Sequence, residues 1–167
     1  MECAVAGFFQ PYWSYRIHDE WTGNLLVNRP DLSPERLART RQLMNAAIPR
    51  ALVTGYEPLI ETLTLPDSND RHVLAAAIHS KASVIVTFNL RDFPKAALAP
   101  YNLIAQSPDD FLFDACTPFE NDFLTMVRRH RSRLTNPPKS LEAYLATLSQ
   151  NHMHRVVDYL SDHIEDL

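Results

Sequence analysis

Glycine is scarce in this chain of 167 residues, which contains three glycines against twelve prolines. Flexible linkers and glycine-rich phosphate-binding loops need several glycines close together, so the sequence offers neither. Cysteine is just as rare. The two cysteines, Cys3 and Cys116, stand far apart in the sequence and match no metal-binding spacing. We therefore expect buried or inert thiols in a reducing compartment.

Long apolar runs are missing as well. None approaches the roughly 18 residues that a membrane-spanning helix requires. The first residues, MECAVAGFFQ, lack the basic start of a signal peptide. The expected location is therefore the cytoplasm, without a membrane partner. The net charge of −4 excludes a broadly basic nucleic-acid coat protein. The one clear basic run, RRHRSR at residues 128–133, is more typical of a solvated helix face than of a phosphate-binding patch.

Hydrophobic patterns divide the chain near residue 106. The preceding part alternates predicted helices (residues 15–26, 34–48 and 70–81) with predicted strands (59–65, 83–88 and 101–106). In the first helix, Ile17, Trp21 and Leu25 form the stripe expected to face inward. Residues 107–167 are almost entirely helical, with Ser107 as one cap and a Thr117–Glu120 capping box. The prediction is an α/β fold whose parallel β-sheet is flanked by helices (1–106), with a helical C-terminal extension (107–167) packed on this core.

Polar residues collect at both ends of one helix–strand unit, LPDSNDRHVLAAAIHSKASVIVTFNLRDFP, residues 65–94. Asn89 and Asp92 follow the buried strand, and Asp70 opens the helix before it. All three are expected at the rim where the strands end. Clustered carboxylates repel one another, and a hard divalent cation such as Mg²⁺ or Mn²⁺ relieves that repulsion. Such an ion can orient water and offset charge on a phosphodiester.

Each of these polar residues also has an ordinary structural interpretation. Asp67 and Asp70 have the spacing of an N-cap and its N3 partner. Asn89 could be a turn residue, and Asp92 could cap the bend at RDFP. Glu20 could pair with Arg16 one helical turn earlier. Spacing alone leaves these alternatives open. For three histidines, His18, His72 and His79, surface or capping roles are favoured over catalysis.

The same 65–94 stretch resembles the signature of PIN-domain ribonucleases, in the subgroup related to VapC-type toxins. That family shows an Asp opening an alanine-rich helix, followed by an apolar strand ending in Thr-x-Asn/Asp-x-x-Asp-Phe. The matching residues here are Asp70, the alanines at 75–77, Thr87, Asn89, Asp92 and Phe93. Upstream, SYRIHDEW resembles the segment in which the family's glutamate follows a serine by six residues, here Ser14 and Glu20. The helical tail resembles the subgroup too, so the likeness covers almost the whole chain.

The resemblance implies a metal-dependent endoribonuclease that leaves a 5′-phosphate and a 3′-hydroxyl. Glu20, Asp70 and Asn89 would hold Mg²⁺ or Mn²⁺, and Asp92 would support them as a further catalytic residue. Three other residues would serve RNA binding: the Thr87 hydroxyl at the rim, and Arg71 and Arg91 toward phosphates. VapC-like members are held inactive by an antitoxin protein encoded beside them. RNA and an antitoxin are thus the implied partners, and a homodimer is a further expectation.

The beginning of the sequence departs from the family pattern. The family opens with a strand ending in an Asp, then a helix, and only then the equivalent of GFFQPYWS. Here MECAVAGFFQPYWS comes first, and Glu2 precedes the wrong segment to replace that Asp. The recorded start could be too late, a small separate polypeptide could supply the strand, or the chain could be a degenerate relative. We expect the 167-residue chain alone to show weak Mg²⁺-dependent ribonuclease activity or none.

Two other functions compete with a ribonuclease. One is a different phosphohydrolase with an acidic rim, which would hydrolyse small phosphoesters and leave RNA intact. The other is a catalytically inactive PIN-like interaction protein, whose acids would serve only as helix caps and would bind neither Mg²⁺ nor Mn²⁺.

Overall fold

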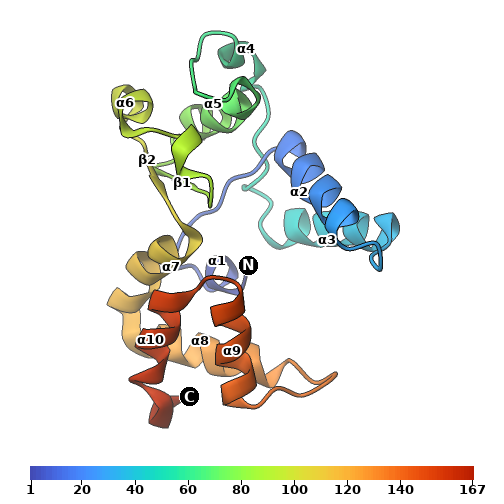
Figure 1. The fold of residues 1–167 in the computed structure, drawn as a ribbon, viewed down its shortest axis with the longest axis vertical. Coiled ribbons are helices and arrows are strands. Elements are labelled where there is room, and N and C mark those ends of the chain that lie inside the picture. Colours follow the sequence, from blue (N-terminus) through green and yellow to red (C-terminus); the bar gives the residue numbers. More distant parts are fainter. The chain divides into compact units, whose positions relative to one another are not determined.

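The computed structural model describes all residues from 1 to 167 and is largely helical (Figure 1). It forms two compact units. We call Gln10–Ile85 with Asn89–Ala105 the α/β unit, and Met1–Phe9, Val86–Phe88 and Gln106–Leu167 the helical unit. Each unit is therefore assembled from separate stretches of the sequence.

The sheet consists of two parallel strands, β1 (Val84–Val86) and β2 (Ile104–Gln106). The backbone N–H of Ile104 donates to Ser83 O at 3.1 Å, and that of Thr87 donates to Gln106 O at 2.9 Å. These strands confirm the predictions over 83–88 and 101–106. The predicted strand 59–65 is wrong, because the chain there is helix α4 (Glu57–Ile60) followed by irregular structure. Its alternating Leu63 and Leu65 are buried all the same, without a neighbouring strand to pair with.

Helices α2 (Tyr15–Asn28) and α3 (Pro34–Ala47) both begin at serine caps. Ser14 Oγ accepts a hydrogen bond from the Ile17 N–H, and Ser33 Oγ accepts one from the Arg36 N–H. The predicted inward face of α2 is wrong by one position. Its buried residues are His18 and Thr22, whereas Leu25 of the predicted stripe is exposed.

Buried His18 belongs to a polar network that joins α2 to α3. Trp21 Nε1 donates to His18 Nδ1 at 3.0 Å, so the ring proton is assigned to Nε2, which lies 3.1 Å from Asn45 Oδ1. Trp13 Nε1 donates to the same oxygen at 2.7 Å. The expected surface role of His18 is therefore wrong, and Asn45 is the acceptor on which two N–H groups depend.

Replacing Asn45 with Ala is expected to reduce the free energy of unfolding by about 2 kcal/mol. The substitution leaves the Trp13 and His18 donors without their acceptor, and an unsatisfied buried donor is costly. Urea unfolding measures the loss. Asn24→Ala, an exposed truncation on α2, is the matched control and should stay within about 0.5 kcal/mol of the wild type. Equal stabilities for the two variants would contradict the network.

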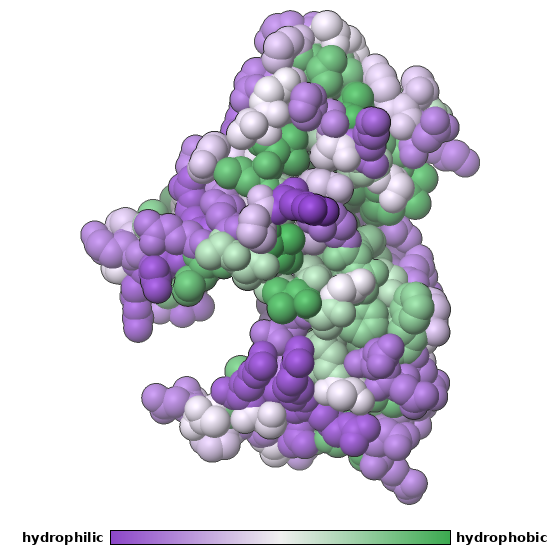
Figure 2. Space-filling model, turned by 180° about the vertical axis from the view of Figure 1, so that it is seen from behind, coloured by the Kyte–Doolittle hydropathy of each residue, from purple (hydrophilic) through white to green (hydrophobic).

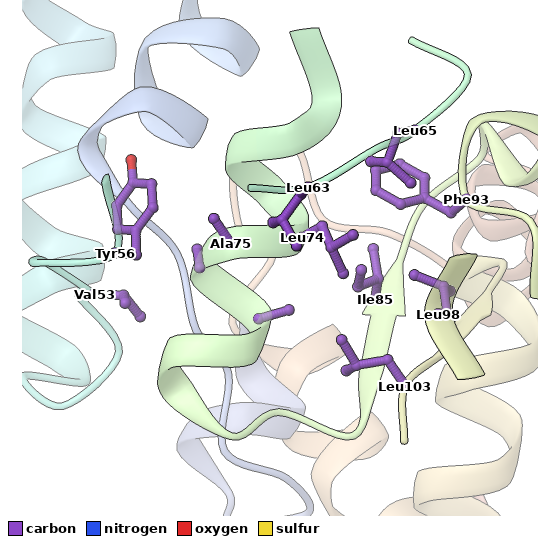
Figure 3. Close-up of a cluster of buried hydrophobic side chains, with 12 residues drawn as sticks. Val53, Tyr56, Leu63, Leu65, Leu74, Ala75, Ile85, Phe93, Leu98 and Leu103 are labelled. Carbon is purple, nitrogen blue, oxygen red and sulfur yellow. The ribbon is translucent and has the colours of Figure 1, made fainter. Parts of the chain in front are cut away.

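The core of the α/β unit lies between α5 (Arg71–Ser80), β1 and the following turns (Figure 3). Leu74 of α5 is fully buried, and Ile85, Phe93, Leu98 and Leu103 converge with it in this close-up. Leu98 ends the short helix α6 (Lys95–Leu98). A 3₁₀ turn, Ser68–Asp70, leads into α5, and Lys81 ends α5 in a left-handed conformation, φ 56°. The predicted helix over 70–81 is confirmed, and packing on the core fixes the two loops that carry acids.

The helical unit contains α1 (Glu2–Val5), α7 (Pro108–Cys116), α8 (Glu120–Ser132), α9 (Leu141–Gln150) and α10 (His154–Ser161). Its separate core includes Phe123, Val127, Tyr144, Val156 and Leu160. The predicted Ser107 cap is confirmed, since Ser107 Oγ accepts from the Asp110 N–H.

The predicted Thr117–Glu120 capping box is wrong. Thr117 Oγ1 donates back to Phe113 O at 2.7 Å within a 3₁₀ turn, Thr117–Phe119. Helix α8 then begins without a side-chain cap.

Asp109 caps the N-terminus of α10 from a distant position in the sequence. Its Oδ2 accepts from the Arg155 N–H at 2.8 Å and its Oδ1 from the Val156 N–H at 3.0 Å. The side chain is buried. Its neighbour Asp110 forms an ion pair with the Arg155 guanidinium at 2.5 Å at a more exposed site.

Hydrophobic side chains also reach the surface, as the green areas among the purple ones in Figure 2 show. The most exposed large ones include Val27 and Phe88, 81% and 64% accessible. None of the helices combines the length and the hydrophobicity needed to cross a membrane.

Candidate metal centre

Three carboxylates of the α/β unit meet at the ends of two short turns. Asp67, Asp70 and Asp92 each offer one oxygen, and these oxygens all lie within 4.8 Å of one another. Asp67 and Asp70 belong to the turn that leads into α5, and Asp92 ends the 3₁₀ turn Leu90–Asp92 after β1. All three side chains are partly buried. The sequence prediction that Asp70 and Asp92 share one rim is consistent with this arrangement.

Only one of the two acids in the turn that leads into α5, Asp67 and Asp70, acts as a helix cap. Asp67 Oδ1 accepts from the Asn69 N–H at 2.8 Å, as an N-cap does. Asp70 makes no side-chain capping hydrogen bond to α5. Helix capping therefore explains the position of Asp67 and does not explain that of Asp70.

Asp70 lies in an unfavourable electrostatic environment. Burial raises the pKa of its carboxyl above the ordinary value of 3.8, and the nearby charges of Asp67, Asp92 and Glu20 raise it further. A raised pKa means that the folded protein resists the negative charge at this position. A bound cation would reverse that preference.

Removing this charge should stabilise the metal-free protein at neutral pH. Because the pKa of Asp70 is higher in the folded than in the unfolded chain, the folded state binds its proton more tightly. The contribution of Asp70 to stability therefore falls as the pH rises from 3.8 through the raised pKa. With EDTA present, Asp70→Asn should gain about 0.5 kcal/mol at pH 7, a small value because solvent screens the site.

The comparison of Asp70→Asn with wild type at two pH values tests this sign. Urea unfolding at neutral pH should show the gain, and the gain should vanish below pH 3.8, where both states protonate Asp70. A gain of the same size at both pH values would contradict the electrostatic explanation.

Glu20 stands beside the three-acid cluster and has partners of its own. Its Oε1 lies 3.7 Å from Arg16 Nε, which confirms the predicted pair one helical turn apart, and 2.7 Å from His72 Nε2. We describe the short contact between His72 Nε2 and Glu20 Oε1 as a close polar contact. Glu20 still contributes to the repulsion at Asp70.

His72 is fully buried on α5, two residues after Asp70, so its expected surface or capping role is wrong. Burial lowers the pKa of His72, while the charge of Glu20 acts in the opposite direction. The imidazole is thus neutral at pH 7, and its second ring nitrogen, Nδ1, is buried without a hydrogen-bond partner. Exposed His79, in the last turn of α5, agrees with the surface prediction.

The remaining predicted residues take different positions. The Asn89 amide donates from Nδ2 to Asp92 Oδ2, so Asn89 joins the cluster through Asp92. Thr87 directly follows β1, and its backbone N–H donates to Gln106 O. Arg71 Nη1 lies 3.3 Å from Glu61 Oε2, and its Nε donates to Ser68 O. Arg91 is exposed on the turn that Asp92 ends.

Comparison with known proteins matches two families along the chain. The PIN domain model matches residues 1–91, which is more than half of the sequence. The chain belongs to the PIN-domain family. A second model, the VapC50 C-terminal domain, matches residues 108–162. No solved structure matches the chain.

One relative of this PIN-domain chain is a Mycobacterium tuberculosis (strain ATCC 25618 / H37Rv) protein described as "Putative ribonuclease VapC50". It is 35% identical over 119 residues, which cover 69% of this chain and 70% of the relative. The resemblance and the fold class predicted from the sequence are thereby confirmed. The roles of individual residues and the boundary at residue 106 stay predictions.

The donor set of this PIN-domain chain suits a hard divalent cation. Mg²⁺ and Mn²⁺ favour carboxylate oxygens at roughly 2.0–2.2 Å, so two ligands of one ion lie about 3–4.5 Å apart. The three aspartate oxygens lie within 4.8 Å of one another, so a small shift would bring them to that spacing. Sequence reasoning missed Asp67 as a candidate ligand. The Asp-x-x-Asp spacing at residues 67–70 indicates a helix cap, and a metal ligand would have the same spacing. In the structure, Asp67 both caps the turn and faces the other two acids.

Proposed function

We propose that this chain is a divalent-metal-dependent endoribonuclease of the PIN family and the toxin component of a toxin–antitoxin pair. The observation that supports this most is the convergence of Asp67, Asp70 and Asp92 in a chain 35% identical to a relative named as a ribonuclease. The three acids come from the segment that carries the family signature.

Asp67, Asp70 and Asp92 would hold Mg²⁺ or Mn²⁺, with Glu20 and Asn89 completing the surroundings of the ion. The bound ion would supply Lewis-acid chemistry, lowering the pKa of water and offsetting charge on the phosphodiester. Asp70 suits the role of central ligand, because it makes no capping hydrogen bond and is repelled by its neighbours.

Other residues of the chain would position these groups. The Asn89 amide orients the Asp92 carboxylate through its hydrogen bond. His72 and Arg16 both lie close to Oε1 of Glu20, at 2.7 Å and 3.7 Å. Fixing the carboxylate in this way before the ion arrives reduces the reorganisation that binding requires.

Arg71 and Arg91 are proposed to contact RNA phosphates, and Thr87 to add its hydroxyl to the same binding surface. The ion pair between Arg71 and Glu61 does not prevent this, since Glu61 is largely exposed and such surface pairs contribute little stability. The proposal also includes a protein antitoxin as partner and a location in the cytoplasm. A homodimer and a small polypeptide that completes the sheet stay predictions from the sequence.

Three substrates distinguish this function from its rivals: a fluorescent single-stranded RNA, DNA of the same sequence, and a small phosphoester. With Mn²⁺ or Mg²⁺, the chain alone should cut the RNA only weakly, the fragments should carry 5′-phosphates, and EDTA should stop the reaction. Hydrolysis of the phosphoester alone would indicate another phosphohydrolase.

Metal binding is measured beside turnover, because it does not depend on the reaction rate. Calorimetric titration should show Mn²⁺ binding that needs the aspartates. Intact RNA together with no binding of either ion would indicate an inactive interaction protein and contradict the proposal.

A further inference from the structure

The two cysteines of the chain contribute to the same core of the helical unit, although 112 residues separate them in the sequence. Cys3 lies on α1 and packs against the hydrophobic core that contains Cys116, the last residue of α7. Cys116 is fully buried, and Cys3 is partly accessible to solvent. The sequence places the two thiols far apart and predicts that they are buried or inert, whereas the structure brings both into one core.

Contacts on both sides of Cys3 hold it in this place. Glu2, its neighbour on α1, forms an ion pair with Arg133 at 3.1 Å. On the other side, the Phe8 ring lies 6.2 Å from the ring of Phe119 and 6.0 Å from that of Phe123, between centroids. The segment Met1–Phe9 is therefore fixed against the helices by charge and by aromatic packing, and the thiols stay near each other in the reduced state.

The two thiols also differ in acidity and in accessibility. The neighbouring Cys116 thiol lowers the pKa of Cys3, and the pKa of Cys116 is raised by its interaction with Cys3 and by burial. A thiolate is the nucleophile in disulfide exchange, and it must be reachable by the oxidant. Cys3 meets both conditions, while buried Cys116 suits the second, intramolecular step.

We propose that Cys3 and Cys116 form a reversible disulfide when the chain meets a low-molecular-weight disulfide of the glutathione class. The bond would tie α1 covalently to the end of α7. Nothing in the proposed nuclease chemistry requires these thiols, so this inference stands independently of it.

The reaction has two steps. The Cys3 thiolate attacks one sulfur of the small disulfide, forms a mixed disulfide and releases one small thiolate, which takes up a proton. Cys116 then loses its proton to solvent, and its sulfur attacks the Cys3 sulfur and releases the second small thiolate. Two protein thiols are oxidised in total, and one small disulfide is reduced to two thiols.

The test uses the full chain incubated with oxidised glutathione, followed by alkylation and intact-mass measurement under denaturing conditions. The wild type should lose both alkylation sites, carry no glutathione and remain monomeric on a non-reducing gel. Dithiothreitol should restore both sites. Because the bond closes a loop of more than 100 residues, the oxidised chain should also melt higher, by on the order of 10 °C.

Single substitutions separate the two steps. Cys116→Ser should stop at the mixed disulfide and retain one glutathione on Cys3. Cys3→Ser should react much more slowly, because only the buried thiol is left. Cys3 is partly exposed, so this variant gives a readout even if Cys116→Ser fails to fold. Two free thiols, two glutathione groups or a disulfide-linked dimer of the wild type would each overturn the proposal.

Discussion

Replacing Asp70 by Asn is expected to reduce metal-dependent RNA cleavage by at least about 100-fold and to weaken Mn²⁺ binding by a similar factor. Even indirect partners of a metal commonly contribute 10- to 100-fold, and a direct carboxylate ligand contributes more. The amide keeps the size of the side chain but offers a neutral oxygen. Because metal-free Asp70→Asn should be slightly more stable than the wild type, lost activity could not be attributed to unfolding.

Asp158→Asn is the matched control for this experiment. It removes the same charge from an exposed position on α10, outside the acid cluster, and should leave cleavage and Mn²⁺ binding unchanged. Calorimetry and a fluorescent RNA assay measure both quantities. Undiminished Mn²⁺ binding by Asp70→Asn would contradict the proposed metal centre.

Two further variants distinguish the ligand set implied by the resemblance from the one that the geometry favours. Asp67→Asn retains an oxygen that can cap the turn, since Asn is as good an N-cap as Asp. Its effect should therefore come from the metal. Weaker Mn²⁺ binding in Asp67→Asn than in Glu20→Gln would identify the three aspartates as the principal ligands.

Asp109→Ala should cost about 3 kcal/mol of the free energy of unfolding, the largest effect expected from a single polar side chain of the helical unit. Both carboxylate oxygens accept backbone N–H groups of α10, and the site is buried. Truncation leaves both donors without a partner and removes a charged N-cap from the start of the helix. Urea or thermal unfolding followed by circular dichroism measures the loss.

Asp110→Ala is the comparison, because it removes the same atoms one position further along α7. The Ser107 hydroxyl and the Arg155 guanidinium lower the pKa of Asp110, but its ion pair is half-exposed. Such a pair contributes about 0–1 kcal/mol. Similar losses for the two variants would contradict the special role of Asp109.

The sequence predicted those elements whose signals are local. Ser107 caps a helix where expected, because a cap needs only the next few residues of the chain. The capping box predicted at residues 117–120 was wrong because the Thr117 hydroxyl donates to the carbonyl of Phe113, a preceding residue that the motif does not include. In 59–65, Leu63 and Leu65 alternate and are buried, but a strand also requires a neighbour, which depends on the tertiary fold.

In the candidate site, too, the sequence predicted what depends on local signals and missed what depends on the tertiary fold. Asp70, Asn89 and Asp92 could be associated because one helix–strand unit carries all three. Contacts between distant segments left no signal in any single motif: His72 against Glu20, Asn45 between Trp13 and His18, and Cys3 beside Cys116. The expectation that an acid on a further strand completes the site also stays a prediction.

The interleaving of the two units constrains how this protein can vary. Phe88, whose ring lies 6.0 Å from that of His152, belongs to the helical unit, yet the next residue along the backbone is Asn89. A chimera that borrows residues 107–167 from a homologue would therefore alter the surroundings of a residue one peptide bond from the proposed catalytic loop. Substitutions in residues 107–167 and in the loop that begins at Asn89 should accordingly be correlated among homologues.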